Sequence, residues 1–271
     1  MLNNIRVNRM LNISPEAIIP PQKLPFKWEI VGASATGNNH LHNNIPCQDA
    51  YHYSMISENT GIAIVSDGAG SYEYSHLGSD FVVKQAAKEF TDLVYEQSWH
   101  IKDRMPDEEK WDKKAYQKMK AIQKALFRYA ETLKLPFDEL SATLIVLIFS
   151  DEGLLVTHIG DGRAGYCNGK NEWHPAIVPY EGDEVGSTAF ITQPIAHYPH
   201  LVRSNLIKDN VKAFTLMSDG CEKLCWRTRE EIKEENRIVK INKPFAPFFN
   251  ATVQILREIF LNAAARKLQE E

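Results

Sequence analysis

Two aspartates in this chain share one local setting. Asp67 lies near the end of Ile62–Gly68 and Asp219 near the end of Phe214–Gly220, each after an apolar run and a serine and before a glycine. A carboxylate at the end of a buried strand is held rigidly, and the glycine lets another atom approach the backbone closely. Two such carboxylates brought together would repel unless a divalent cation lay between them. The repeated pattern therefore indicates an oxygen-ligand site for Mg²⁺ or Mn²⁺.

Other polar residues have more than one interpretation. Asp49 follows Gln48 in a polar loop and is a third candidate carboxylate, although Asp-Gly and similar pairs are also ordinary turn residues. Asp161-Gly162 is predicted to form a hairpin turn between two strands, with Arg163 pairing locally. The histidines have no compact zinc-site spacing, so we expect them on the surface or in loops.

Composition excludes several classes of protein. The chain has 31 Lys and Arg against 35 Asp and Glu, a net charge of −4, which argues against a nucleic-acid partner. No apolar run is long enough to span a membrane, and the longest, Ala142–Phe149, has the length of a buried strand. Four cysteines without a paired Cys-x-x-Cys spacing favour a reducing cytoplasm over a disulfide-linked or structural zinc fold.

Periodicity places the regular elements that would position these side chains. Apolar residues at helical spacing predict helices over 78–97, 111–133 and 245–268, the first two packed as an antiparallel pair. Short apolar runs predict strands over 26–35, 61–66, 142–149, 154–159, 163–167 and 211–217. Sheet and helix layers are thus segregated, which is an α+β fold.

The chain ends give the predicted domain boundaries. Four prolines within residues 1–25 predict an extended N-terminal arm, because proline at that density blocks a helix. Residues 26–271 are predicted to form a single domain. The stretch 173–204 is rich in Pro, Gly and His and is predicted to be irregular.

The order of the motifs resembles that of the metal-dependent protein serine/threonine phosphatases, the type 2C family, and most closely a bacterial branch of it. The resemblance spans about residues 28–260. The matching segments, in the family's order, are Cys47–Ala50, Val65–Gly70, Ser141–Thr143, His158–Ala164, Gly186–Phe190 and Leu216–Gly220.

This resemblance implies a fold and a catalytic activity. The fold would be an antiparallel β-sandwich flanked by pairs of helices, with two divalent cations, Mn²⁺ or Mg²⁺, at one end of the sheets. The family closes with a further strand and a metal-binding aspartate after the last helix. Here the sequence ends at Lys267–Glu271. The resemblance therefore implies a phosphatase-like domain that is shortened at its C-terminus, lacks the last strand and has reduced activity.

The resemblance also implies roles for individual residues. Asp67 would bridge both cations, the backbone carbonyl of Gly68 would bind one of them, and Asp219 would bind the other. Asp49 would hold a metal-bound water in the outer shell, and Asp138 would bind a weaker third metal, unless it is only a helix cap or loop charge. A water bridging the metals would attack the phosphate of phosphoserine or phosphothreonine.

The chain departs from the family at three positions near these motifs. Gln48 stands where many members have Glu, and Ala69 stands where some have a His. Asn44 lies near the place of an arginine that clamps phosphate in some members, a role that His40 or His42 could take over.

Three functions follow as hypotheses. The first is a cytoplasmic, metal-dependent phosphoprotein phosphatase in signalling, with a phosphoprotein substrate, a serine/threonine kinase as its counterpart, and neither nucleic acid nor membrane as a partner. The second is a weak or inactive module of the same fold that binds a phosphoprotein. The third is a hydrolase of a small phosphoester, because a metal site handles the phosphate and says little about the leaving group.

Overall fold

A computed structural model describes residues 28–180, 188–232 and 237–270. The predicted arm over residues 1–25 and the start of the Gly186–Phe190 motif lie outside these ranges. The predicted strand over 26–35 is wrong where the structure describes it, because residues 28–35 form no strand. Only Trp28 is firmly anchored there, its ring lying 5.3 Å from that of Phe149 between the two sheets described below.

The larger sheet has five antiparallel strands in the order β1-β2-β3-β4-β7. Its central strands β3 and β4 are buried on both faces, which explains their nearly continuous apolar sequences. The strands are β1 (Asp49–Met55), β2 (Gly61–Asp67), β3 (Leu144–Ser150), β4 (Gly153–Ile159) and β7 (Arg203–Ile207).

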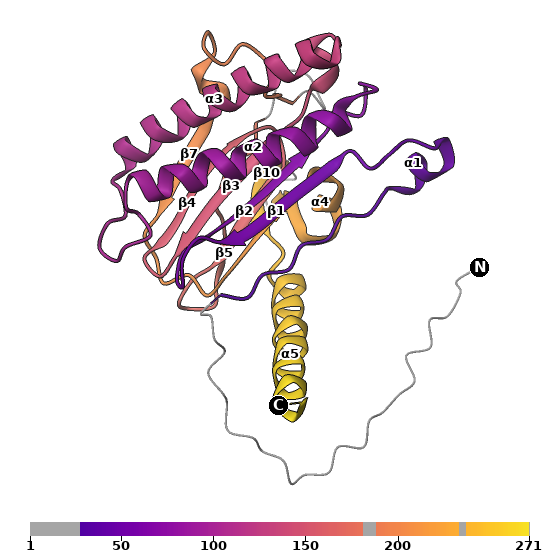
Figure 1. Ribbon diagram of the computed structural model, residues 1–271. Coiled ribbons are helices and arrows are strands. Elements are labelled where there is room, and N and C mark those ends of the chain that lie inside the picture. Colours follow the sequence, from indigo (N-terminus) through magenta and orange to yellow (C-terminus); the bar gives the residue numbers. More distant parts are fainter. Residues whose placement is uncertain (1–27, 181–187, 233–236, 271) are drawn as a thin grey trace, which may run out of the picture.

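Two long helices, α2 (Ser75–Glu96) and α3 (Glu108–Leu133), pack side by side on one face of this sheet, as predicted (Figure 1). The side chain of Asp107 caps α3 by accepting a hydrogen bond from the Lys110 amide. Between the helices the rings of Phe81 and Tyr129 stack at 4.4 Å. The apolar faces of both helices bury against alternate residues of β2 and β3.

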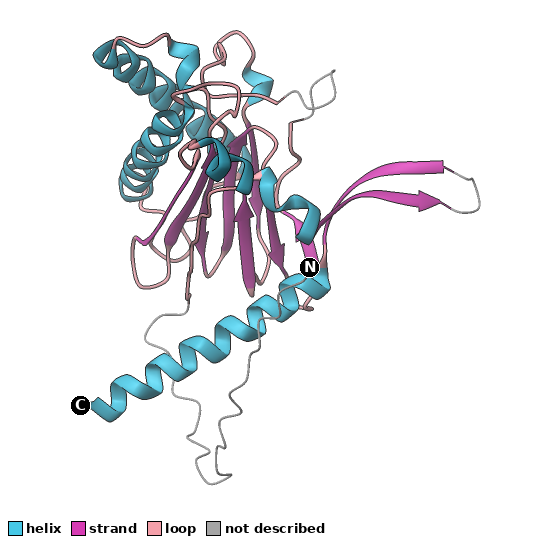
Figure 2. Ribbon diagram, turned by 90° about the vertical axis from the view of Figure 1, so that its right-hand side faces the viewer, coloured by secondary structure: helices cyan, strands magenta, loops and turns pink. Residues whose placement is uncertain are grey.

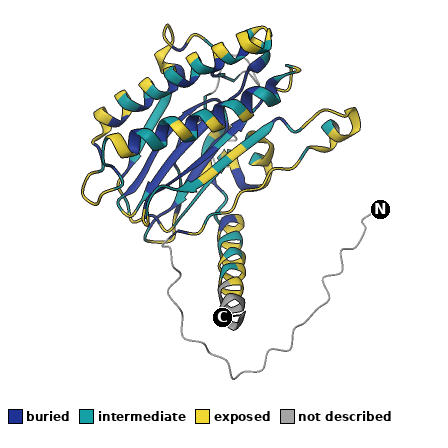
Figure 3. Ribbon diagram, viewed as in Figure 1, coloured by how far each residue is buried: buried dark blue, intermediate teal, exposed yellow. Residues whose placement is uncertain are grey.

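The opposite face of the large sheet packs against a smaller sheet, in the order β6-β5-β8, to form a sandwich. Side chains of β3 alternate between the two cores: Val146 faces the helices, whereas Leu147 faces the second sheet. Figure 3 shows that the central strands are buried and the outer faces of the helices exposed. The strands are β5 (Arg163–Cys167), β6 (Trp173–Pro175) and β8 (Ala213–Met217).

Two further elements extend from this body. Strands β9 (Trp226–Ile232) and β10 (Arg237–Pro244) form a separate two-stranded ribbon that projects outward (Figure 2). Helix α5 (Ala246–Glu270) is anchored at its first turns by Phe249, which packs on Trp173 and Trp226, and then points away from the sheets (Figure 1).

The α+β class and the antiparallel sheets are therefore as predicted, whereas the helical flanks differ. In the part of the chain that the structure describes, one packed pair, α2 and α3, covers the large sheet, whereas α5 contacts the smaller sheet only with its first turns. No strand follows α5 within the described residues. None of the described helices is long and apolar enough to cross a membrane.

Three connections also differ from the prediction. Asp161-Gly162 is not a hairpin turn, because β4 and β5 belong to different sheets. The polar loop before Asp49 contains a short helix, α1 (Asn38–Asn43). The stretch 173–204, which was predicted to be irregular, contains β6, a short helix η2 (Pro199–Leu201) and the start of β7. The remaining short helices are η1 (Phe137–Leu140), η3 (Asp219–Cys221) and α4 (Glu222–Cys225).

Candidate active site

Strand pairing brings Asp49 and Asp67 together. The last residue of β2 pairs with the first residue of β1, so that Asp67 lies directly opposite Asp49. Opposite residues of antiparallel strands project from the same face at close range. The proximity of these two carboxylates therefore follows from the register of one hairpin.

The backbone around Asp67 is fixed by the beginning of β3. The Asp67 amide donates to Thr143 Oγ1 at 3.0 Å, and the Thr143 amide donates back to the Asp67 carbonyl at 2.8 Å. The Ser66 hydroxyl donates to the Thr143 carbonyl at 2.6 Å. Thr143 and Ser66 are buried, so this clamp is shielded from water. The Asp67 side chain consequently leaves a backbone with little freedom.

Gly68 continues this rigid segment through a crowded place. Its amide donates to the Gln48 carbonyl at 3.0 Å, and a Cβ at this position would lie 2.7 Å from the Ser75 carbonyl oxygen. Real Cβ atoms do not approach backbone that closely, so only glycine fits. The buried Gln48 side chain donates to the Ser75 hydroxyl at 2.7 Å and the Tyr72 carbonyl at 3.2 Å. Gln48 thus ties the site to the start of α2.

The smaller sheet supplies two more carboxylates. Asp219 follows β8, and Asp161 lies in the connection that crosses from β4 to β5. The preceding Gly160 has a φ of 116°, and a Cβ there would also lie 2.6 Å from Thr143. All four aspartates line one cleft of about 1050 Å³: Asp49, Asp67, Asp161 and Asp219.

The cleft is strongly anionic. Among the described residues that line it there is no lysine or arginine, and His40 is the one basic side chain. Burial, followed by the charges of Asp49 and Asp219, raises the pKa of Asp67 from 3.8 to about 8. A hydrogen bond with Asp219 also favours the protonated form of Asp67. Without a counter-cation, Asp67 therefore carries a proton at neutral pH.

The neighbouring carboxyls are perturbed in the same direction. Burial raises the pKa of Asp49, against hydrogen bonds from Ser218 and Asp67 that lower it. Burial, with the charge of Asp219, raises the pKa of Asp161. One carboxylate oxygen of Asp49, Oδ1, is buried without a hydrogen-bond partner in the structure. The charges of His40 on Asp49 and of Arg163 on Asp161 act in the opposite direction but do not outweigh burial.

This donor set fits divalent cations in chemistry and charge. Carboxylate oxygens are the preferred ligands of Mg²⁺ and Mn²⁺, and a dication would relieve the repulsion that raises the pKa of Asp67. The cleft is not a preformed cage, however. Among the residues that the structure describes, no three His, Cys, Asp or Glu side chains converge closely enough to hold a metal ion. The aspartates pair with one another through hydrogen bonds instead.

The structure does not bring every predicted site residue to the cleft. Gly68 and His40 line it together with the aspartates. His42 is exposed on α1 and Asp138 is exposed on η1, and neither is among the lining residues. Asp161 is the residue that the hairpin interpretation missed. The sequence did contain a clue to its position. Gly160 directly precedes Asp161 between two apolar strands, and this pattern is compatible with a connection between two sheets as well as with a hairpin turn.

Arg163 does not pair locally as predicted. Its guanidinium binds Glu222 of α4 at 2.7 and 2.8 Å and donates to the side-chain oxygen of Asn242 in β10 at 3.1 Å. Trp226 Nε1 donates to the same Asn242 oxygen at 2.7 Å. Because Glu222 lies three residues after Asp219, this buried network braces the Asp219 segment against β5 and the ribbon.

The chain is similar in sequence to known protein phosphatases. The family model of protein phosphatase 2C matches residues 36–270. Serine/threonine-protein phosphatase 3 of Escherichia coli (strain K12) is 27% identical over 251 residues, which cover 91% of this chain and 87% of that protein.

Solved structures give more distant likenesses. Serine/threonine phosphatase Stp1 from Staphylococcus aureus has a TM-score of 0.46 and 14% identity, over 70% of this chain and 74% of that one. The serine-threonine phosphatase 2C from Toxoplasma gondii has a TM-score of 0.47 and 14% identity, over 66% and 75%. Because the family model matches most of the sequence, the chain belongs to the protein phosphatase 2C family.

Proposed function

We propose that this protein is a metal-dependent phosphatase that removes phosphate from phosphoserine and phosphothreonine in proteins. The observation that carries this proposal is the cleft in which four aspartates meet at the ends of two sheets without a lysine or arginine among the described lining residues. Membership of the protein phosphatase 2C family and the name of the E. coli relative support the substrate class.

Each residue of the cleft has a defined part in this proposal. Asp67, Asp219 and the backbone carbonyl of Gly68 would hold two divalent cations, Mn²⁺ or Mg²⁺. When bound, these cations would activate water and neutralise charge on the phosphoryl oxygens. Asp49, with one buried oxygen that has no partner, would orient the attacking water by accepting a hydrogen bond from it. The clamp between Thr143 and the Asp67 backbone would keep this geometry fixed during attack.

His40 is the side chain best placed to meet the substrate. It lines the cleft from α1, and its charge lowers the pKa of Asp49, which indicates proximity to the carboxylates. We assign it contact with the phosphoryl group. Asp138 and His42 lie outside the cleft lining, so the proposal gives them no part.

The setting of the reaction is proposed to be the cytoplasm. All four cysteines are free thiols, which suits a reducing compartment. A phosphoprotein phosphatase there would act against a serine/threonine kinase and thereby in signalling.

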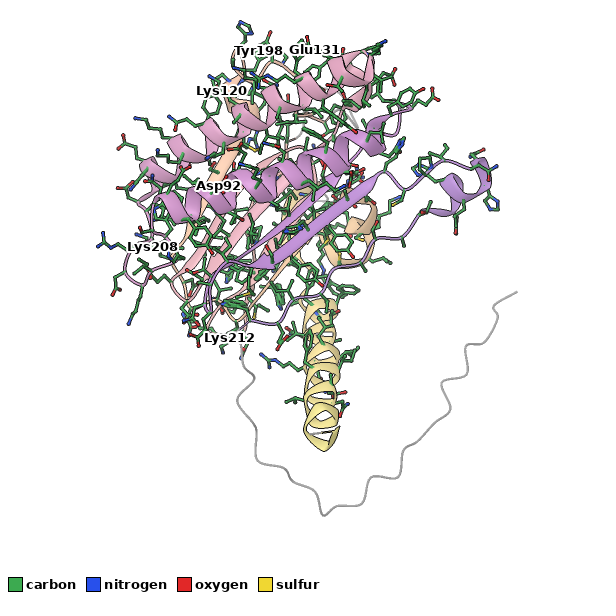
Figure 4. All side chains as sticks on the ribbon, in the orientation of Figure 1. Asp92, Lys120, Glu131, Tyr198, Lys208 and Lys212 are labelled. Carbon is green, nitrogen blue, oxygen red and sulfur yellow. The ribbon has the colours of Figure 1, made fainter. Side chains whose placement is uncertain are left out.

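The test is hydrolysis of p-nitrophenyl phosphate and of a phosphothreonine peptide during a Mn²⁺ and Mg²⁺ titration. We expect activity that requires the cation and falls at least a hundredfold in Asp67→Asn, the order expected when a metal centre is broken. Asp92→Asn is the control, because Asp92 is a half-exposed aspartate of α2 that pairs with Lys88 outside the cleft (Figure 4).

Three outcomes separate the hypotheses. Turnover of the peptide that depends on Asp67 supports the proposal. Turnover of small phosphoesters without turnover of phosphopeptides would contradict the proposal and favour a hydrolase of small molecules. The third outcome is Mn²⁺ binding in calorimetry without turnover of either substrate, in protein that melts cooperatively. It would contradict the proposal and favour a binding module.

A further inference from the structure

The ribbon of β9 and β10 carries an unusual arrangement of charge. In its register Arg229 lies directly opposite Lys240, and Arg227 lies directly opposite Lys243. Residues that oppose one another across two strands project from the same face, and like charges in such pairs are destabilising. All four side chains are exposed. We call this surface the cationic face of the ribbon: Arg227, Arg229, Lys240 and Lys243.

The charges of the ribbon contribute little to its fold, apart from Arg227, whose guanidinium lies over the Phe245 ring at 4.8 Å. A two-stranded ribbon is marginal by itself, and opposite charges in these cross-strand pairs would stabilise it. A register shift between Lys240 and Lys243 keeps the second pair aligned on the same face as the first. The two pairs are separated by two residues of β9, which is about 7 Å. The ribbon therefore presents four positive charges on one face, which also carries the exposed Glu231, two residues after Arg229 in β9.

The position of the ribbon connects this face with the cleft. Asp219 is followed without a break by η3, α4 and then β9, so the ribbon begins seven residues after a cleft aspartate. Asn242 of the ribbon accepts hydrogen bonds from both Arg163 and Trp226, which ties the ribbon base to β5. From that base the ribbon projects away from the sandwich (Figure 2).

We propose that the cationic face binds an acidic, extended segment of the phosphoprotein substrate, at a distance from its phosphorylated residue. Charge complementarity carries the choice of an acidic segment. The ribbon is a sheet of only two strands, so each strand has an edge without a strand partner in the described sheet and can pair with an extended polypeptide. This inference rests on the proposed function for the identity of the partner, although binding itself does not.

A polypeptide fits this surface better than a nucleic acid does. The chain has a net charge of −4, and the cleft beside the ribbon base holds four aspartates. A long phosphate backbone would meet this negative field beyond the two charged pairs, whereas an acidic run of a few residues would match their length.

The test uses charge reversal that leaves the ribbon intact. The double variant Arg229→Glu with Lys243→Glu turns both like-charged pairs into opposite-charged pairs, so the ribbon should fold at least as well as before. Lys120→Glu with Lys124→Glu on the exposed face of α3 makes the same change in net charge and is the matched control. Figure 4 shows Lys120 on the outside of this helix.

The first readout is binding without catalysis. A fluorescein-labelled peptide containing six glutamates is titrated with each variant in EDTA, so that no cation in the cleft can attract it. We expect the ribbon variant to lose about tenfold in affinity and the α3 control to lose less than about twofold. Equal affinity of the wild type and the ribbon variant would overturn the proposal, whether or not the protein is a phosphatase.

The second readout is kinetic. A phosphothreonine peptide is compared with the same peptide carrying the acidic run on a flexible linker. We expect the acidic run to lower KM about tenfold for the wild type, but not for the ribbon variant, with kcat and p-nitrophenyl phosphate hydrolysis equal in both. An equal KM advantage in the ribbon variant would refute the docking role while leaving phosphatase activity standing.

A single-stranded oligonucleotide with as many charges as the peptide tests the class of partner. We expect it to bind more weakly than the glutamate peptide at 150 mM salt, a concentration of about the physiological order. Tighter binding of the oligonucleotide, lost in the ribbon variant, would overturn the assignment of a polypeptide partner.

Discussion

The cleft and the ribbon both set like charges against one another, but they do so in different surroundings. In the cleft Asp67 is largely buried, and its pKa is raised to about 8. On the ribbon Arg229 and Lys240 face each other in water. The buried cluster can relieve its repulsion only by binding protons or cations, whereas salt in the solvent screens the exposed pairs. Burial therefore leaves the repulsion in the first region to be relieved by protons or cations, whereas the solvent itself weakens the repulsion in the second.

The largest effect should come from the cleft in metal-free protein. The folded-state pKa of Asp67, about 8, lies above the unfolded value of 3.8, so the folded state binds the proton more tightly. The contribution of Asp67 to the free energy of unfolding is then fully present below about pH 4 and is lost as pH rises towards 8, by at most about 6 kcal/mol. Urea unfolding in EDTA across this range should show the loss in wild type and a flatter profile in Asp67→Asn. If stability changed with pH in the same way in the wild type and in Asp67→Asn, protonation of Asp67 would not be the cause of the pH dependence.

The next effect concerns the network between the two regions. Arg163→Met would leave the Glu222 carboxylate without its partner in a side chain that is only 26% exposed. We expect about 3 kcal/mol of destabilisation, near the lower end for a broken buried pair. The double variant with Glu222→Gln should recover part of this loss, which a double-mutant cycle in urea would measure. A cycle without coupling between the two residues would show that the brace is unimportant.

The buried His158 should make stability depend on pH in the opposite direction from Asp67. It therefore distinguishes the effect of burial from the effect of repulsion between like charges. Burial lowers the pKa of His158, inside β4, from 6.5 to about 4. Its contribution to stability is thus present above pH 6.5 and is lost as pH falls towards 4, by at most about 3 kcal/mol.

In His158→Gln the acid side of the stability profile should flatten, whereas His200→Gln, at an exposed position, should leave it unchanged. Urea unfolding between pH 4 and 7 measures both. Equal acid sensitivity in the two variants would mean that His158 is not the titrating group.

The smallest effect is expected on the ribbon. Arg229→Glu with Lys243→Glu should raise the free energy of unfolding by about 0.2–1 kcal/mol per pair. The gain should shrink in high salt, because these charges are exposed. Thermal melts at low and high salt would detect it, and a clear loss of stability would mean that the ribbon register differs.

The sequence predicted the strands that have apolar runs and the helices that have one apolar face. The apolar runs of β2, β3, β4 and β8 and the periodicity of α2 and α3 are confirmed. Strands at edges were missed for a physical reason. β1 is half exposed and reads Asp-Ala-Tyr-His-Tyr-Ser-Met, which lacks an apolar face. The ribbon strands are rich in Arg, Lys and Glu and have no core of their own.

The missed strands also limited what could be inferred about the cleft. Asp67 and Asp219 were selected because each follows a buried strand, but the pairing of Asp49 with Asp67 depends on β1. Asp161 was interpreted as a turn because consecutive strands usually pair, and here the chain changes sheets instead. The prediction for residues 28–35 failed because only Trp28 and, in part, Ile30 of that stretch pack against the core, and the rest is mostly exposed.

The hairpin of β1 and β2 also determines where the chain could tolerate insertions. A slip of one residue in this pairing would turn Asp49 to the other face of the sheet. Its loop is closed by two amides that donate to the Thr60 carbonyl. The last residue pair before this loop lies six pairs from the aspartates, about 20 Å along the strands. Extra residues or a fluorescent label at exposed Glu58 would lengthen the loop while leaving the pairing unchanged. That loop is therefore the natural attachment point for a reporter.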